Sequence, residues 1–167
     1  MKKYTVRELH DGAIKNITTD GGIYFLKMPS NFEIKVKEKN DGRQCTSKGK
    51  PSEYPVERPE KKVKLVYGCD PRQYSTDIIY IGQTNHSVGL QQRLIEYLGF
   101  RYDDETIKKP HDGGRAAWQI ENNENLIVEV EPADKQLTKE EIEEKERHYI
   151  KEFKEKYHNY PLANQRL

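Results

Sequence analysis

Two short tyrosine-containing stretches carry side chains that could take part in one reaction. Gly22-Ile23-Tyr24 lies near the start of the chain, and Tyr80-Ile81-Gly82 lies near its middle. Arg93 and Glu146 add a guanidinium and a carboxylate. Hydrolysis of a phosphodiester needs an activated water, neutralisation of developing negative charge, and a divalent ion that stabilises the leaving oxygen. Phenolic hydroxyls, a guanidinium and a carboxylate are the side-chain types that this chemistry uses.

Glu146 stands out among many acidic residues because it lies on the apolar side of its expected helix. That apolar stripe has helical spacing and consists of Ile142, Tyr149, Ile150, Phe153 and Tyr157. An ionised carboxylate that faces the interior must be paired, bound to a metal, or placed in a polar cleft. Arg93 likewise lies on or beside the apolar side of its own helix. A buried ion pair between Glu146 and Arg93, snorkelling side chains, or a shared polar site would each explain these positions.

The tyrosines require strands to position them. Residues 22–28 and 77–84 are expected to be strands, and so is 62–68, which contains Tyr67. Residues 32–37 alternate apolar and charged side chains, which is typical of a half-buried strand. Residues 125–132 predict another strand with Leu126, Val128 and Val130 on one face. Trp118 and Ile120 alternate as the inward residues of a strand would, and packing in the core is expected for both.

Two helices are expected to carry Arg93 and Glu146. The first begins after Gly89 and should stop at Gly99. The second begins at Thr138, where Glu141 completes a capping box and Leu137 with Ile142 forms a hydrophobic staple, and it must end before Pro161.

The order of these elements predicts one domain over residues 1–167 of the α/β or α+β class, with a small mixed or antiparallel sheet flanked by helices. Residues 37–59 contain several glycines and prolines and few large apolar residues, so an irregular excursion is expected there. Residues 33–64 contain ten Lys and Arg against six Asp and Glu, a local net charge of +4 in a chain whose formal charge is +1. A solvated polar loop and a basic binding surface both fit this excess.

Composition narrows the class of protein. The chain has 167 residues and a mean hydropathy of −1.05, and it has neither an apolar run long enough to cross a bilayer nor the apolar stretch of a signal peptide. A cytoplasmic protein without membrane contact is therefore expected. The two cysteines, Cys45 and Cys69, lack the spacing of a zinc site, so free thiols are expected.

Taken together, the motifs resemble those of the GIY-YIG nuclease family. The matching residues occur in the family's order and span nearly the whole chain: Gly22-Ile23-Tyr24, Tyr80-Ile81-Gly82, Arg93, Glu146 and Asn164. The segment 111–120, HDGGRAAWQI, is similar to a block of bacterial members that carry a long insertion between the two tyrosine strands. The resemblance implies such an insertion at about 32–77 and a metal-dependent endonuclease that hydrolyses DNA.

The resemblance also implies roles for individual residues. Glu146 would hold one Mg²⁺ or Mn²⁺, and Tyr24 would orient or deprotonate the attacking water with help from Tyr80. Arg93 would neutralise the phosphate, and Asn164 would support the site. DNA contacts are expected from His111 and Arg115, as phosphate contacts or as supporting groups, and from the lysines of the insertion, Lys35, Lys37, Lys48, Lys50, Lys61, Lys62 and Lys64.

Several alternatives remain open at the level of sequence. Tyr67 is closer to Tyr80 in the chain, but Leu65 stands where the family has glycine, so Tyr24 is preferred as the first tyrosine and Tyr67 is its alternative. The same residues fit a structure-selective repair nuclease, a non-catalytic nucleic-acid-binding module, or a scaffold that binds protein. A single active site cuts one strand per visit, so double-strand cleavage would require a homodimer or two successive events.

Overall fold

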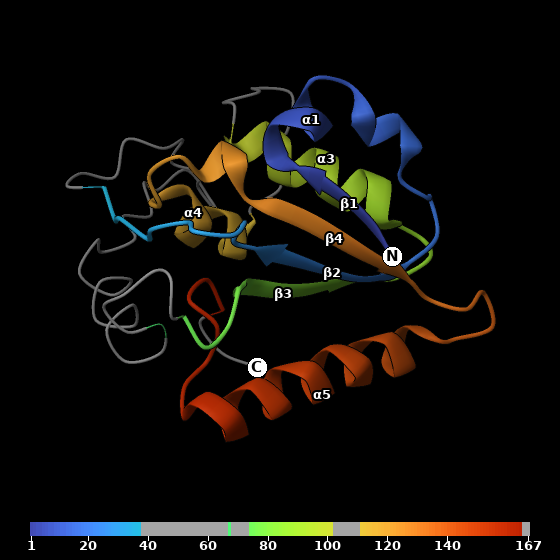
Figure 1. Cartoon of the computed structure of the whole chain (residues 1–167). Helices are drawn as coiled ribbons and strands as arrows, with labels where there is room; N and C mark the ends of the chain where they lie inside the picture. Colours follow the sequence, from blue (N-terminus) through green and yellow to red (C-terminus); the bar gives the residue numbers. More distant parts are fainter. Residues whose placement is uncertain (38–66, 68–73, 102–110, 165–167) are drawn as a thin grey trace, which may run out of the picture.

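The computed structural model describes residues 1–37, 67, 74–101 and 111–164, and these contain one four-stranded sheet (Figure 1). The strands are β1 (Lys2–Thr5), β2 (Gly22–Lys27), β3 (Ile78–Thr84) and β4 (Ile127–Pro132). Their order is β1-β4-β2-β3, and every neighbouring pair is antiparallel. The expected α+β class with a small sheet and flanking helices is confirmed. The two tyrosine strands, β2 and β3, are direct neighbours.

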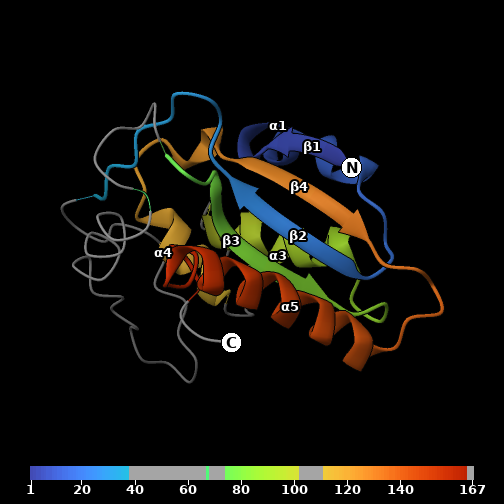
Figure 2. The ribbon, with the colours of Figure 1, turned by 60° about the horizontal axis from the view of Figure 1, so that its bottom comes forward.

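Helices cover both faces of the sheet. One face packs against α1 (Val6–His10), α3 (Leu90–Arg101) and α4 (Asp112–Trp118), whereas α5 (Lys139–Tyr157) crosses the other face over β2 and β3 (Figure 2). Two short 3₁₀ helices, η1 (Ala13–Asn16) and η5 (Asn123–Asn125), complete the elements of the described residues. Side chains alternate along β2, so Tyr24 joins the core cluster on the α3 side and Phe25 joins the cluster under α5.

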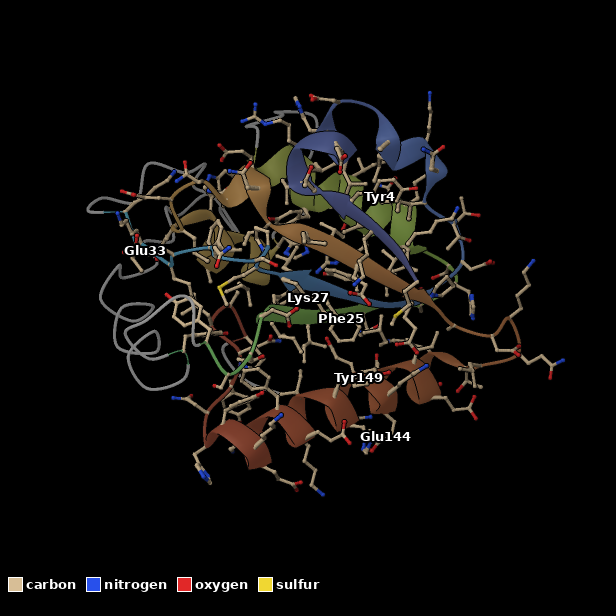
Figure 3. All side chains as sticks on the ribbon, in the orientation of Figure 1. Tyr4, Phe25, Lys27, Glu33, Glu144 and Tyr149 are labelled. Carbon is tan, nitrogen blue, oxygen red and sulfur yellow. The ribbon has the colours of Figure 1, made fainter. Side chains whose placement is uncertain are left out.

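Helix α5 follows the sequence prediction closely. The Thr138 hydroxyl accepts a hydrogen bond from the Glu141 backbone N–H at 3.2 Å, and the Glu141 carboxylate accepts one from the Thr138 N–H at 2.7 Å. Tyr149 points from α5 toward the sheet and meets the Phe25 ring edge-on at 5.3 Å (Figure 3). Among the described residues, no helix combines the length and apolar character needed to span a membrane.

The strand predicted over residues 32–37 is wrong. Residues 32–37 form only an isolated bridge between Val36 and Ile120. Its backbone bonds run from Lys37 N–H to the Gln119 carbonyl and from Glu121 N–H to the Lys35 carbonyl. The predicted core packing of Trp118 and Ile120 is confirmed, because both side chains are buried; Trp118 ends helix α4 and Ile120 forms the bridge with Val36. Residues 32–37 alternate between apolar and charged side chains without joining a sheet, because a single extended segment can pack against the end of a helix.

The predicted stop of α3 at Gly99 is also wrong, because the helix continues to Arg101. Packing of its apolar side chains, which include Leu90, Leu94 and Tyr97, outweighs the cost of about 1 kcal/mol for an interior glycine. In the predicted strand 62–68 only Tyr67 is described, and it does not lie in a strand. The predicted insertion at 32–77 falls mostly outside the described residues.

The chain returns after α5 to the outer edge of β3. Ala163 N–H donates to the Ile79 carbonyl at 2.9 Å. The Asn164 amide then bonds both backbone groups of Ile81, accepting from its N–H at 2.9 Å and donating to its carbonyl at 2.8 Å. This side chain therefore replaces a neighbouring strand at the centre of the Tyr80-Ile81-Gly82 motif.

Replacing Asn164 by alanine should destabilise the fold, because both backbone groups of Ile81 lose a buried partner. We expect Asn164→Ala to lower the free energy of unfolding by about 1–3 kcal/mol, measured by urea denaturation. Asn125→Ala is the matched control, since Asn125 is exposed. A loss no larger than that of the control would show that the amide does not hold this edge.

Candidate active site

The two motif tyrosines lie side by side on the α3 face of the sheet. Tyr24 pairs across the ladder with Gly82, and the Tyr24 and Tyr80 rings are 5.8 Å apart. A Cβ atom at Gly82 would lie 2.6 Å from the Tyr24 hydroxyl and 2.6 Å from the Tyr80 ring, and one at Gly113 would lie 2.2 Å from the Tyr80 ring. Glycine is thus required at both positions by the space that the tyrosine rings occupy.

His111 fixes the hydrogen bonding of Tyr24. Its Nδ1 accepts a hydrogen bond from the Gly114 backbone N–H at 2.8 Å, which caps helix α4, and its Nε2 lies 2.8 Å from the Tyr24 hydroxyl. Burial, reinforced by the nearby charge of Arg93, lowers the pKa of His111 to about 3, so the ring is neutral. A neutral ring that accepts at Nδ1 carries its proton on Nε2. His111 therefore donates to Tyr24, and the Tyr24 proton must point elsewhere.

Arg93 reaches the tyrosines from helix α3. Its Nη1 lies 2.8 Å from the Glu96 carboxylate one turn later, and Glu96 is itself buried. Burial alone would lower the pKa of Arg93, but the Tyr24 and Tyr80 hydroxyls and Glu96 raise it overall. The guanidinium is therefore permanently charged, and one ion pair leaves several of its five N–H donors for other acceptors.

Glu146 approaches Arg93 and the two tyrosines from helix α5, which covers the opposite face of the sheet. Burial, and secondarily the neighbouring Glu143, raise the pKa of Glu146 to about 7, although Arg93 and Arg147 oppose this shift. Within the described part of the chain, no side chain forms an ion pair or a hydrogen bond with its carboxylate. A buried ion pair between Glu146 and Arg93, one of the alternatives that the sequence leaves open, is therefore not formed within the described residues. Glu146 is thus a partly buried carboxylate that has no counter-ion in direct contact among the residues described.

Both tyrosine hydroxyls are protonated at neutral pH. Burial raises the pKa of Tyr24, with the positive charge of Arg93 and a hydrogen bond with Tyr80 as opposing effects. Burial and the adjacent Tyr24 raise the pKa of Tyr80 well above its ordinary value. Glu146 raises the pKa of both further, so its negative charge is felt at both hydroxyls.

The raised pKa of Glu146 predicts how stability changes with pH. The native carboxyl keeps its proton up to about pH 7, whereas the unfolded one loses it near 4.5. The native state therefore binds more protons between these values, and the contribution of Glu146 to stability falls as pH rises. Without added metal, Glu146→Gln should raise the melting temperature more at pH 8 than at pH 5.

Melting curves of wild type and variant at both pH values test this prediction. The informative quantity is the difference in melting temperature between wild type and variant, because other carboxylates change the stability with pH in the opposite sense. Burial tends to raise the pKa of Glu129, but hydrogen bonds and charge from Lys27 and Lys3 lower it overall. An equal effect of Glu146→Gln at both pH values would contradict the raised pKa.

Tyr67 lies apart from these groups. Its hydroxyl donates to the Ile78 carbonyl and accepts from the Leu162 backbone N–H at 3.0 Å. Its ring packs edge-on against Tyr74. Both ends of its hydrogen-bonding capacity are thus used by the backbone, which is the arrangement of a structural tyrosine.

Of the residues expected to contact DNA, the structure describes the side chains of His111, Lys35 and Lys37. His111 is completely buried, and Arg115 belongs to α4 but its side chain lies outside the described residues. Lys35 is exposed and lies 3.3 Å from Glu33, and Lys37 is half-buried beside the Val36 bridge. The remaining predicted lysines lie outside the described residues: Lys48, Lys50, Lys61, Lys62 and Lys64.

Two residues of this site are missed by the sequence prediction. Glu96 pairs with Arg93, and the Tyr97 ring packs edge-on against His111 at 5.3 Å. The spacing of Arg93 and Glu96 on one helix is a usable signal, but such pairs most often lie on the surface. Comparison with models of protein families, with curated proteins and with solved structures found no match for this chain.

Proposed function

We propose that the protein is a metal-dependent DNA endonuclease of the GIY-YIG type. The observation that carries the proposal is the placement of Glu146, a partly buried carboxylate without a partner among the described residues, near a guanidinium and two tyrosine hydroxyls. Five positions that the family resemblance selects from distant parts of the chain meet at or beside one strand, β3. A buried carboxylate that serves only packing would be expected to have a partner.

The residues present fit a single hard cation. Carboxylate oxygen is the ligand that Mg²⁺ and Mn²⁺ prefer, and Mg²⁺ usually takes one or two carboxylates with water and phosphate oxygens. No cluster of three or more His, Cys, Asp or Glu side chains occurs in the described residues, so Glu146 would be the main protein ligand there. When bound, the metal would stabilise negative charge on the scissile phosphate and the leaving 3′ oxygen.

Tyr24 would orient the attacking water. Because His111 donates to the Tyr24 oxygen, the Tyr24 proton is directed away from His111. Once Tyr24 has released its own proton to solvent, the Tyr24 oxygen would accept a proton from the attacking water, and the His111 N–H would stabilise the phenolate until then. Tyr80, whose ring contacts both Tyr24 and His111, would hold this arrangement in place.

Arg93 would bind the scissile phosphate. Glu96 holds one end of its guanidinium, which fixes its orientation while leaving other N–H groups for phosphate oxygens. Asn164 would act indirectly by holding the backbone between Tyr80 and Gly82. Since His111 is completely buried, its role would be to position Tyr24 and not to contact phosphate.

DNA binding itself is proposed from charge and from the family resemblance. Lys35, Lys37 and Arg115, together with the lysines of the insertion, would contact the phosphate backbone of the DNA. The enzyme would act in the cytoplasm, and cleavage of both strands would need a homodimer or two successive events.

The test is incubation of the wild-type protein with plasmid, linear and branched DNA in Mg²⁺, Mn²⁺ or EDTA. We expect cutting in either metal and none in EDTA. DNA ligase should seal the nicks directly, because the 3′ oxygen is the leaving group. Salt-sensitive binding without cutting in any metal would instead indicate a non-catalytic nucleic-acid-binding module, and a lack of DNA binding would favour a protein-binding scaffold.

A further inference from the structure

Gln83 carries a polar atom that the fold leaves unsatisfied. In the described part of the chain, three buried side-chain oxygens lack a hydrogen bond, one each in Gln83, Gln119 and Glu129. The Glu129 oxygen lies 3.0 Å from Lys27 Nζ and 3.3 Å from Lys3 Nζ, and Gln119 takes part in further interactions. Among the described residues, the Gln83 amide oxygen has neither a hydrogen-bond donor nor a nearby cation, and such a group costs stability until it finds a donor.

The backbone of Gln83 is also available at the edge of the sheet. Ile79 and Ile81 direct their backbone groups outward from β3, where Ala163 and Asn164 bond them. Alternate residues of a strand point the same way, so the N–H and C=O of Gln83 face this edge as well. Among the described residues nothing bonds them. Gln83 therefore presents a backbone donor, a backbone acceptor and a side-chain amide at one position.

These groups border a cavity beside the proposed phosphate-binding arginine. The cavity has a volume of about 200 Å³ and is lined by Gln83, Thr84, Asn85, Val88, Arg93 and Glu96. A group that fills it while Arg93 holds the scissile phosphate must therefore lie close to that phosphate along the nucleic-acid chain. A cavity of this volume has room for one planar base.

We propose that this cavity binds the hydrogen-bonding edge of one unpaired nucleobase next to the cleaved bond. Ile81, two residues earlier on the same edge of β3, provides a precedent. The Asn164 side chain bonds the backbone N–H and C=O of Ile81 through one adjacent acceptor and donor. The pairing edges of adenine and cytosine present the same adjacent pair, an amino group beside a ring nitrogen. The Gln83 backbone offers the complementary pair, and a base amino group can also supply the donor that the side-chain oxygen lacks.

The inference rests on the proposed nuclease function and narrows its substrate. In an intact duplex the pairing edges are already bonded to the opposite strand, so they cannot reach Gln83 without extrusion of the base. The preferred substrate is therefore DNA with an unpaired nucleotide beside the scissile phosphate, as in a bulge, a mismatch or a flap.

Binding in EDTA separates this inference from catalysis. Two fluorescent duplexes would be compared by anisotropy, one with a single unpaired adenosine and one with an abasic nucleotide at the same position. We expect wild type to bind the adenosine duplex about tenfold more tightly, because two or three hydrogen bonds distinguish the two duplexes. Gln83→Met should reduce the ratio to about threefold, whereas Gln92→Met, at an exposed position of α3, should leave it unchanged.

The possible outcomes are distinct. Equal affinity for the two duplexes, or a preference that Gln83→Met leaves intact, would overturn the inference even if the wild type cuts plasmid in Mg²⁺. A preference that depends on Gln83, in a protein that cuts no DNA, would retain the cavity as a base-binding site and overturn the proposed nuclease.

Discussion

Glu146→Gln is expected to lower the single-turnover rate of DNA cleavage in Mg²⁺ by about 10³-fold or more. Glutamine has nearly the same shape as glutamate, but its neutral amide is a poor ligand for a hard cation. A bound metal contributes several kcal/mol to stabilisation of the transition state, and each 1.36 kcal/mol corresponds to about a tenfold change in rate. The variant should remain folded and, without metal, gain stability at neutral pH, because it removes a carboxylate that burial disfavours.

Glu144→Gln is the matched control for this experiment. Glu144 lies two positions earlier on α5 and points into solvent (Figure 3), where it pairs with Arg147 at 3.0 Å. Such an exposed pair contributes about 1 kcal/mol or less, so the control should cleave at the wild-type rate. Equal rates for the wild type and the Glu146 variant would remove Glu146 from the proposed reaction.

Tyr24→Phe should reduce the cleavage rate by about 10²–10⁴-fold, the range typical of a group that moves or positions a proton. The substitution removes the hydroxyl that would orient the water and keeps the ring that packs over Gly82. It also leaves the Nε2–H of His111 buried without an acceptor, which should lower stability by about 1–3 kcal/mol. DNA affinity measured in EDTA should stay within a few-fold of the wild type.

Two further tyrosine variants serve as controls for Tyr24→Phe. Tyr4→Phe alters a partly buried tyrosine on β1, at the far edge of the sheet from β3 (Figure 3), and should change neither rate nor affinity. Tyr67→Phe should destabilise the fold through the loss of bonds to Ile78 and Leu162 while leaving the rate per folded molecule unchanged. A large loss of rate for Tyr67→Phe, with little loss for Tyr24→Phe, would reverse the assignment of the first tyrosine.

The elements that local signals specify could be predicted from the sequence. Thr138 and Glu141 mark the start of α5 because a capping box is complete within four residues. The sequence also singled out Glu146, because a charged side chain within the apolar stripe of a helix needs a partner or a polar environment where that stripe packs. Tyr24 and Tyr80 could be placed on strands, but their contact depends on the pairing of β2 with β3, which is a long-range feature.

Helix α4 could not be predicted because tertiary contacts override weak local preferences. Its sequence includes Gly113 and Gly114, which disfavour a helix, and its N-cap is His111 instead of a usual capping residue. Burial of Ala116 and Ala117 and the space under the Tyr80 ring, which admits only glycine at 113, define this segment. The bond between His111 and Tyr24 then follows from the cap and not from any spacing in the sequence.

The most direct test of the account is the rate of plasmid nicking as Mg²⁺ is increased, measured at pH 6 and at pH 8. If Glu146 holds the metal, protons compete with Mg²⁺ for a carboxyl whose pKa is raised to about 7. We therefore predict nicking that requires Mg²⁺, with half-maximal rate at a roughly tenfold higher concentration at pH 6. Nicking that persists in EDTA, or its absence at every Mg²⁺ concentration from a folded protein, would contradict the central claim.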